Sequence, residues 1–500
     1  MDPVTLTLIV GLLVVVCIYA KNRKRYNLPP GPKGYPFIGN TLDFQIEGRP
    51  PWLHFTKLAE EYGDIFNFKM GYGIPENVIV LNTGDTVSKA FVKMDKIDNR
   101  PTSWSLDFFT DGSRDISNGQ PHDPVWKLMR KLVTSGLRNS LALSDSKVQT
   151  AAEKGVEVFR KNLDKPFDMK PTLNLMVYNV ICDMLFNKRF EEGDQDFDDL
   201  YRALDGVNTL FGNTGVLEDV IPLMKYIPYK IPSTRKVIEQ FDHMIGFLRK
   251  HFEEHKAQFD PAHLTDITDY LLQAREKTRQ EDPQLADKFT DRHLVQIISD
   301  MFGAGVDTST HTLYWIMYFM AKHPEVQTRI QDELDEYIGD RPLKMSDKQT
   351  LVYCDAVMHE TLRLCPIGPV AIHTAACDVQ IDGFDIPKDC QVWANIYACH
   401  RDVRAWDEPE SFKPERFIHA DGKIIARPKS WLAFSAGRRS CVGESVGRQH
   451  VFLFFTSIMQ KFSVRFPADS PVKDSQLESN FLTNPFFCMS KPFELVISER

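Results

Sequence analysis

The sequence predicts a mainly helical protein with a small β subregion, and three observations support this fold class. Apolar residues recur at helical spacing through most of residues 125–363. Short alternating segments, typical of strands, lie both before and after that stretch. A glycine-flanked loop with a single cysteine, at 434–443, precedes a last apolar helical run. We therefore expect a helical body with a small sheet drawn from both ends of the chain.

The strand-like segments are 65–70 and 78–81 near the start, and 379–386 and 391–396 after the helical part. A final helix is expected from about 443 to 461, and the tail alternates apolar and polar residues over 493–497.

The longest expected helix runs from Thr290, a suitable N-cap, to Lys322, with Pro324 just beyond. Its middle, 303–310, contains two glycines and several β-branched residues, which are poor helix formers. We expect a local break in the helix there, of the kind found at functional sites. Close packing against another helix is the alternative explanation.

Composition and charge limit the class of protein. A chain of 500 residues, 43% hydrophobic and 26% charged, can bury a large core. The net charge of −8 argues against non-specific nucleic-acid binding. The nine cysteines form no C-x-x-C pair and no zinc spacing, which favours free thiols in a reducing compartment.

The N-terminus carries the one membrane signal in the sequence. Val4 to Ala20 is uncharged, and basic residues follow at 21–25. This predicts an anchor at 1–25 that crosses the membrane once, with the rest of the chain in the cytosol; a cleaved signal peptide is the alternative. A proline-rich hinge at 26–40 follows, and 41–500 is expected to form one catalytic domain.

The loop around Cys441 has the features of a site for an axial thiolate ligand. A helix N-terminus lowers the pKa of a thiol, and Gly437 and Gly443 would let a planar group approach the backbone. Arg438 and Arg439 offer charge for anionic substituents. These properties suit haem iron. A buried cysteine in a tight turn is the alternative.

Two further pairs could support such a site. Glu360 and Arg363 lie one helical turn apart and, with Arg416, could form a buried structural cluster. Trp126 and Arg130 could reach a carboxylate of a bound macrocycle, and Arg439 and His373 could join them. Taken singly, the two pairs are better explained by ordinary structure: an exposed ion pair for Glu360 and Arg363, and an amphipathic helix for Trp126 and Arg130.

Together these motifs resemble the cytochrome P450 haem-thiolate monooxygenases, in the family's order and over nearly the whole chain. The shared motifs are F-x-x-G-x-R-x-C-x-G at 434–443, E-x-x-R at 360–363, P-E-R-F at 414–417, A-G-x-D-T at 304–308 and W-x-x-x-R at 126–130. The chain is most similar to microsomal animal members: 300–306 resembles steroid 17-alpha-hydroxylases, and 259–269 resembles the aryl-hydrocarbon-hydroxylating branch.

The resemblance implies a role for each matching residue. Cys441 would be the proximal ligand of haem b, and Asp307 and Thr308 would deliver protons to dioxygen on the distal side. Ser309 and Ser435 depart from residues common in the family without affecting these roles. The haem propionates would be held by Trp126, Arg130, His373 and Arg439.

The resemblance also implies an apolar pocket, a membrane-dipping substrate-access loop at 217–231 and a basic docking face. The pocket would be lined by Phe108, Phe109, Met301, Phe302, Ala304, Val370 to Ile372, Phe486 and Phe487. Asn208 and Asn213 could bind a sterol hydroxyl. The docking face would be formed by Lys127, Lys131, Arg438 and Arg448. Ordinary solvated surface charge is the alternative for this face, and a buried connector is the alternative for the access loop.

The function predicted is therefore a monooxygenase of the endoplasmic reticulum membrane that hydroxylates a lipophilic, steroid-like or aromatic substrate. Electrons would come from NADPH through cytochrome P450 reductase, with cytochrome b5 as a second candidate partner. A haem-thiolate isomerase or dehydratase and a non-catalytic haem-binding protein are the alternatives. The sequence does not identify the substrate.

Overall fold

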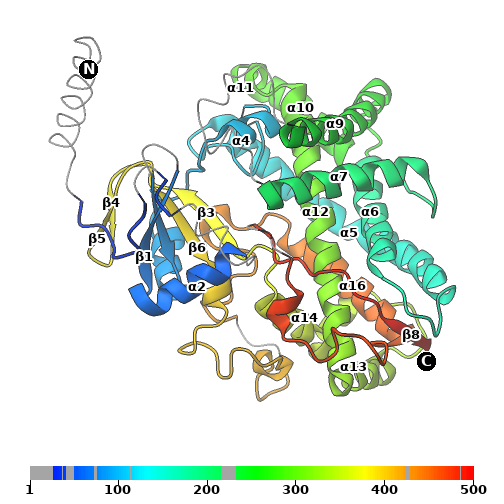
Figure 1. The fold of residues 1–500 in the computed structure, drawn as a ribbon. Helices are drawn as coiled ribbons and strands as arrows, with labels where there is room; N and C mark the ends of the chain where they lie inside the picture. Colours follow the sequence, from blue (N-terminus) through cyan, green and yellow to red (C-terminus); the bar gives the residue numbers. More distant parts are fainter. Residues whose placement is uncertain are drawn as a thin grey trace, which may run out of the picture.

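The computed structural model describes residues 26–35, 38–40, 50–71, 76–112, 114–214, 232–423, 427–482, 484 and 486–500. Helices fill one side of the molecule, and a small sheet lies at the other side, next to the N-terminal part (Figure 1). The predicted anchor at 1–25, the access loop at 217–231 and the side chains of Asn208 and Asn213 lie outside the described residues. Within the described residues, no helix is both long and apolar enough to cross a bilayer.

The main sheet joins strands from both ends of the chain, as predicted. Its strand order is β1-β2-β6-β3, with β2 parallel to β6 and the other neighbours antiparallel. The strands are β1 (Ile65–Met70), β2 (Glu76–Leu81), β6 (Gln391–Asn395) and β3 (Val370–Thr374). Phe55 of α2 (Pro51–Tyr62) covers one face, with its ring 5.3 Å from Phe68 and 5.7 Å from Trp393. The apolar rings hold α2 on the sheet.

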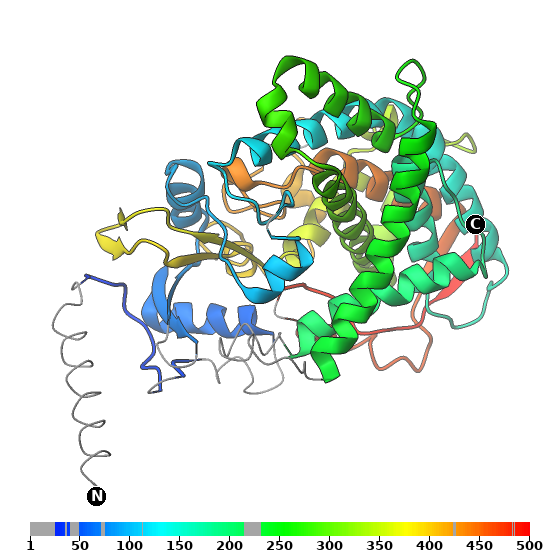
Figure 2. The ribbon, with the colours of Figure 1, turned by 90° about the horizontal axis from the view of Figure 1, so that it is seen from above.

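The helical body confirms the mainly α prediction. Figure 1 and Figure 2 show α12 running through its middle, with the other long helices around it. Its longer helices are α5 (Pro124–Arg160), α6 (Lys170–Phe186), α7 (Gln195–Thr214), α9 (Pro232–Gln258), α10 (Ile267–Glu281), α12 (Asp291–Lys322), α13 (Pro324–Tyr337), α14 (Val352–Leu364) and α16 (Glu444–Lys461). Shorter helices are α3 (Gly84–Val87), α4 (Trp104–Phe109), α11 (Pro283–Lys288) and α15 (Ile396–Cys399).

The predicted break in the long helix is wrong, because α12 is continuous from Asp291 to Lys322. The hydroxyl of Thr308 donates to the carbonyl of Ala304 at 2.7 Å, which satisfies this polar side chain within the helix. Gly305 has a packing role: a Cβ there would lie 3.0 Å from Cδ1 of Ile181 on α6. Close helix packing, the alternative, explains this glycine.

Two strand predictions also need correction. Residues 379–386 form two strands, β4 (Val379–Ile381) and β5 (Phe384–Ile386), because Asp382 and Gly383 turn the chain with φ of 49° and 85°. The tail strand is β8 (Val496–Glu499), later than the predicted 493–497. It pairs with β7 (Phe462–Arg465), which the sequence did not predict.

The start of the predicted hinge is fastened to the body of the molecule by hydrogen bonds. The backbone N–H of Asn27 donates to the Asp385 carboxylate, and the N–H of Asp385 donates to the Asn27 carbonyl, both at 2.8 Å. The N–H of Asn67 on β1 donates to the Pro30 carbonyl at 2.7 Å. These bonds give residues 27–30 a fixed path along the body.

Candidate active site

Cys441 lies between the 3₁₀ turn η7 (Gly437–Arg439) and the first turn of α16. Its backbone N–H donates to the carbonyl of Phe434 at 3.0 Å, which closes the loop that carries it. Its side chain is exposed, a property shared among the described cysteines only with Cys377. The alternative of a cysteine buried in a turn therefore does not hold.

The predicted low pKa of this thiol is not found in the protein alone. The Cys441 side chain is accessible, but it lies among many protein atoms that displace part of its hydration, and this desolvation raises the pKa of the thiol. The effect outweighs the backbone N–H groups of Gly443 and Glu444 and the charge of Arg130, which lower the pKa. The helix N-terminus therefore acts in the predicted direction but does not dominate. A coordinated metal ion deprotonates a thiol outright, so a thiolate here would come with the metal.

One glycine of the loop, Gly437, has a packing role within the protein. Gly437 adopts φ of 75°, and a Cβ there would lie 1.9 Å from the carbonyl oxygen of Phe91. This residue is therefore a glycine because the loop packs against the backbone of the π-helical turn η3 (Ser88–Val92). At Gly443 the nearest atom to such a Cβ is Sγ of Cys441, at an ordinary 3.9 Å.

A group of cationic side chains converges beside the cysteine loop. Arg130 of α5 donates to the carbonyl of Ser440, the residue before Cys441, at 2.7 Å. Arg439 donates from Nε to the carbonyl of Asp98 at 2.8 Å and from Nη2 to that of Gly119 at 2.5 Å. Arg130 and Arg439 were both predicted for this site, and the structure brings them together.

Arg100 is a further member that no sequence motif revealed. Its Nε donates to the carbonyl of Ser117 at 2.8 Å, and its Nη1 donates to the carbonyl of Ile372. Burial and the neighbouring Arg130 lower the pKa of Arg100 to about 10. Burial and the neighbouring Arg100 lower the pKa of Arg439 to about 9. The arginines thus repel one another in a site that favours an anion.

His373 of β3 joins this cluster. Its Nδ1 lies 2.8 Å from the carbonyl of Ile97, and its ring stacks on Phe91 with centroids 3.7 Å apart. Burial lowers the pKa of His373 to about 3, so the ring is neutral. Among the described residues, Nε2 of His373 and Nη1 of Arg439 are buried without a hydrogen-bond partner. Such atoms normally have one. Nη1 of Arg439 is a donor and fits an acceptor such as a carboxylate. Nε2 of the neutral His373 ring is an acceptor, because the proton lies on Nδ1, which faces the Ile97 carbonyl.

Trp126 takes part in a way that differs from the prediction. Its ring N–H donates to the carbonyl of Ile116 at 2.9 Å, so this group is already used within the protein. The guanidinium of Arg439 lies 4.1 Å from the centre of the ring. Trp126 therefore supports the orientation of Arg439 through a cation–π contact.

The predicted pocket residues on α12 separate into two groups. Ala304 is exposed, and Met301 and Thr308 are half-buried, so these three share the accessible face. Phe302 is fully buried, with its ring 5.5 Å from that of Tyr178 on α6. Its assignment to the pocket lining is therefore wrong, because the helix turns this side chain into the core.

The other predicted pocket residues lie on several segments. Phe108 and Phe109 of α4 pack against Phe241 of α9, with ring centroids 6.3 and 4.7 Å apart. Val370 to Ile372 on β3 are half-buried. Phe486 is exposed and Phe487 half-buried.

Glu360, Arg363 and Arg416 meet in one buried cluster. Glu360 accepts from Nε and Nη2 of Arg363 at 2.7 and 2.8 Å, and from Nε of Arg416 at 3.1 Å. Arg363 also donates to the carbonyls of His400 and Pro409. The cluster thus joins α14 to the segment that leads to the cysteine loop.

An exposed thiol beside a buried cationic cluster, in a mainly helical fold, defines a site suited to a metal-bearing macrocycle with acidic substituents. Comparison with known proteins agrees: the cytochrome P450 family profile matches residues 29–489. The chain belongs to the cytochrome P450 family and is a monooxygenase of the oxidoreductase class.

Three relatives illustrate how broad the similarity is. A steroid 17-alpha-hydroxylase/17,20 lyase of Squalus acanthias is 33% identical, over 92% of this chain and 90% of the relative. Cytochrome P450 1A1 of Chelon auratus is 32% identical, over 90% and 89%. Cytochrome P450 2D4 of Rattus norvegicus is 32% identical, over 100% and 98%. The family implies a haem cofactor with a cysteine thiolate ligand.

Proposed function

We propose that this protein hydroxylates a lipophilic, steroid-like or aromatic substrate with O₂ and electrons from NADPH, delivered by a reductase. The observation that carries the proposal is the meeting of the exposed Cys441 thiol with the cluster of Arg100, Arg130, His373 and Arg439. Membership of the family supplies the reaction class, and the named relatives support the substrate class.

The residues in this site have separate tasks. Cys441 would ligate the haem iron, and His373 and the three arginines would bind the propionates. When bound, the haem supplies activation of dioxygen at a thiolate-ligated iron. Burial raises the pKa of Asp307 to about 7, despite the opposing charge of Lys170. A carboxyl with that pKa both holds and releases a proton near neutral pH, and Thr308 would pass the proton on.

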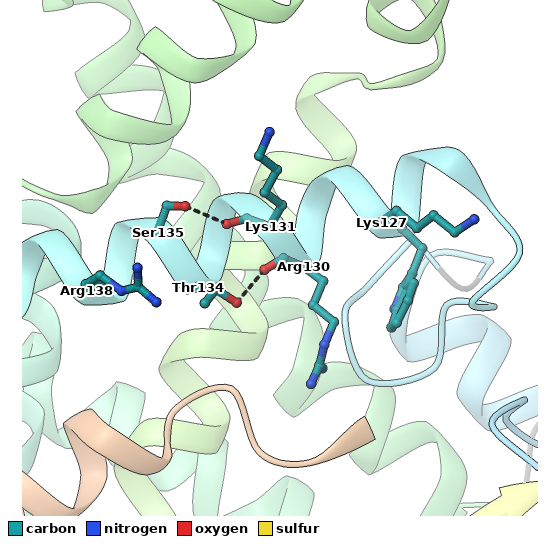
Figure 3. Close-up of a pocket in the computed structure, with 7 residues that line it drawn as sticks. Lys127, Arg130, Lys131, Thr134, Ser135 and Arg138 are labelled. Atoms are coloured by element: carbon teal, nitrogen blue, oxygen red, sulfur yellow. Dashed lines mark hydrogen bonds between the residues drawn. The ribbon is translucent and has the colours of Figure 1, made fainter. Parts of the chain in front are cut away.

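The reductase would dock on a hollow of about 330 Å³ along α5 (Figure 3), with cytochrome b5 as a second candidate. The hollow is lined by Trp126, Lys127, Arg130, Lys131, Thr134, Ser135 and Arg138. Arg438 is exposed but does not line this hollow, and it pairs with Asp98 at 3.2 Å. Arg448 does not fit the predicted docking face, because it is largely buried and lies 3.1 Å from His359. An anchor at 1–25 would hold the protein on the endoplasmic reticulum membrane.

The test is spectroscopic. We expect the reduced, carbon-monoxide-treated protein to show the long-wavelength band of thiolate-ligated haem, and Cys441→Ala to lose it. Steroids and planar aromatics should then be compared by their shifts of the Soret band and by product formed with the reductase. A band that survives in Cys441→Ala would refute the ligand assignment. Product formation without NADPH would favour an isomerase or dehydratase, and binding without any product would favour a non-catalytic haem protein.

A further inference from the structure

We propose that a chain of ordered water molecules between α6 and α12, held by Asn174, Tyr178 and His311, supplies protons to Asp307. This inference rests on the proposed function and extends it by naming the route from solvent to the acid. The route runs along the face of α12 that packs on α6. Thr308 lies with Ala304 on the accessible face of the same helix.

Two polar stripes face each other where these helices meet. On α6, Lys170, Asn174 and Tyr178 are four residues apart and so share one face, and on α12 the same spacing aligns Asp307 with His311. The two helices lie side by side in Figure 1.

Several contacts fix how the helices align. At one end the hydroxyl of Tyr314 on α12 donates to the carboxylate of Asp168, just before α6, at 2.9 Å. Towards the other end the rings of Tyr178 and Phe302 are 5.5 Å apart. The stripes therefore run antiparallel, with Lys170 near His311 and Tyr178 near Asp307.

The contact between α6 and α12 is called the seam below. Three buried polar atoms in this seam have no hydrogen-bond partner among the described residues. They are Nδ2 of Asn174, the hydroxyl of Tyr178 and Nδ1 of His311. Their residues are only 2%, 1% and 3% exposed, so bulk solvent does not reach them. An unsatisfied buried polar group is costly and rare, and three in one seam point to bridging water.

Electrostatic effects indicate that the seam reaches both Asp307 and the surface. Burial is the main cause that raises the pKa of the Tyr178 hydroxyl, and the charge of Asp307 raises it further. Burial is also the main cause that lowers the pKa of His311 to about 3, and the charge of Lys170 contributes to this shift. His311 is therefore neutral and can both accept and donate a hydrogen bond. Lys170, the residue of the α6 stripe nearest its start, is half-buried. Asp205 of α7, whose charge acts on Asp307, is exposed.

The proton balance along this route is simple. A proton enters from solvent near Lys170 and Asp205, moves along the water chain, and binds the Asp307 carboxylate. Each proton that Asp307 releases towards Thr308 is replaced by one from the seam, so the seam gains no net charge. Asn174, Tyr178 and His311 act as positioning residues, because they orient the waters.

The test is Tyr178→Phe in the full-length, haem-loaded protein. Removing only the hydroxyl keeps the ring contact with Phe302. We expect a severalfold smaller fraction of NADPH recovered as product, a matching rise in hydrogen peroxide, and a larger solvent deuterium isotope effect on product formation. Crystal structures should show ordered water between Asn174, Tyr178 and His311 in the wild type, and the loss of at least one such water in the variant.

Tyr318→Phe is the matched control. Its hydroxyl accepts from Nδ2 of Asn480 at 3.2 Å, so its loss should lower stability and leave the partition between product and peroxide unchanged. The proposal is overturned if the crystal structure shows no ordered water in the seam. It is also overturned if Tyr178→Phe stabilises the protein and leaves the ratio of product to hydrogen peroxide unchanged, because removal of a hydroxyl that has no water partner would have that effect. A wild type that forms no product with the reductase would refute the proposed function instead, and the water positions would still decide the structure of the seam.

Discussion

Glu360 is a buried charge that is enclosed by hydrogen-bond partners. It is fully buried, and its two carboxylate oxygens accept from Arg363, Arg416 and the backbone N–H of Lys413. Arg363 is equally buried, so each charge depends on the other for its solvation. A buried ion pair adds little to the stability of the folded protein compared with an apolar pair of similar size. The loss of one partner, however, destabilises the protein strongly, because the other charge stays buried and unpaired.

Glu360→Ala should therefore destabilise the protein by about 3–5 kcal/mol, because it leaves Arg363 charged, buried and without a carboxylate. Denaturant unfolding of purified protein measures this change. The control is Glu192→Ala, which removes an exposed ion pair with Lys161. That change should cost less than about 1 kcal/mol. Equal losses in the two variants would mean that burial of the cluster has no energetic consequence.

The hydroxyl of Thr308 is a second group whose removal should have a measurable effect. Its hydroxyl lies on the accessible side of α12 and donates to the Ala304 carbonyl, one turn back. Under the proposed function Thr308 receives protons from Asp307. Thr308→Ala should therefore divert NADPH oxidation from product to hydrogen peroxide.

Thr308→Ser, which keeps a hydroxyl, should restore most of the coupling between NADPH use and product. The measurement is the ratio of product to NADPH consumed, with the thermal stability of each variant recorded alongside. Equal ratios in wild type and Thr308→Ala would contradict the assigned role.

At the scale of single residues, sequence patterns predicted what lies close along the chain. Glu360 and Arg363 share one helical turn, and Trp126 and Arg130 share another, so their spacing carried the signal. The sequence around Arg100 gave no such signal, because its hydrogen-bond partners Ser117 and Ile372 come from other segments of the chain. The wrong assignment of Phe302 to the pocket lining has a similar cause. Its position next to small residues in the sequence did not show whether its side chain points to the pocket or to the core.

Among the elements, the junction of α9 and α10 contains a clamp between two helix ends. Nε2 of His255, in the last turns of α9, lies 2.7 Å from the Asp266 carboxylate, and its Nδ1 lies 2.9 Å from the carbonyl of His251. Asp266 also caps α10, accepting from the backbone N–H of Asp269 at 3.0 Å. One carboxylate therefore holds both helices.

The clamp should make stability depend on pH. The hydrogen bond to Asp266 raises the pKa of His255 above 6.5, although burial opposes it. The protonated form is thus favoured in the folded protein. Its contribution to stability is fully present below pH 6.5 and is lost as the pH rises through the higher folded pKa.

The stability difference between wild type and His255→Gln should therefore shrink as the pH rises from 6 through this range. Thermal unfolding of both proteins across a pH series measures it. His263→Gln is the control, because His263 is well exposed and its pairing with Asp260 is open to solvent. A constant difference between wild type and His255→Gln would show that the clamp does not titrate.

Elements were predictable where the local pattern and the tertiary structure agree. The ends of α12 match the positions of Thr290 and Pro324, and β1 matches the alternation of 65–70. By contrast β7 follows α16 directly, so no turn signal marks its start, and only its partner β8 makes it a strand. The turn at Asp382 and Gly383 was overlooked because alternation continues on both sides of it.

Across the whole molecule, the distribution of charge matters more than its total. The net charge is −8, yet four basic side chains line the hollow along α5, and Arg130 extends from it towards the cysteine loop (Figure 3). Lys127 and Lys131 are exposed there. A local basic surface of this kind attracts an acidic partner even when the total charge is negative.

Reversing both charges, in Lys127→Glu/Lys131→Glu, should slow association with the reductase roughly tenfold or more at low ionic strength. The effect should fade as salt screens the surface. The rate of first-electron transfer at increasing reductase concentration measures it, and the carbon monoxide band checks that the haem site is intact.

Lys250→Glu/Lys277→Glu is the matched control, because these lysines are exposed on α9 and α10 and do not line the hollow. It changes the total charge by the same amount and should leave the rate near that of the wild type. If both double variants slow the reaction equally, net charge governs the encounter, and the hollow is not the docking site. If only the first does so, and salt abolishes the difference, electrons enter on the side of the molecule where Arg130 meets the cysteine loop.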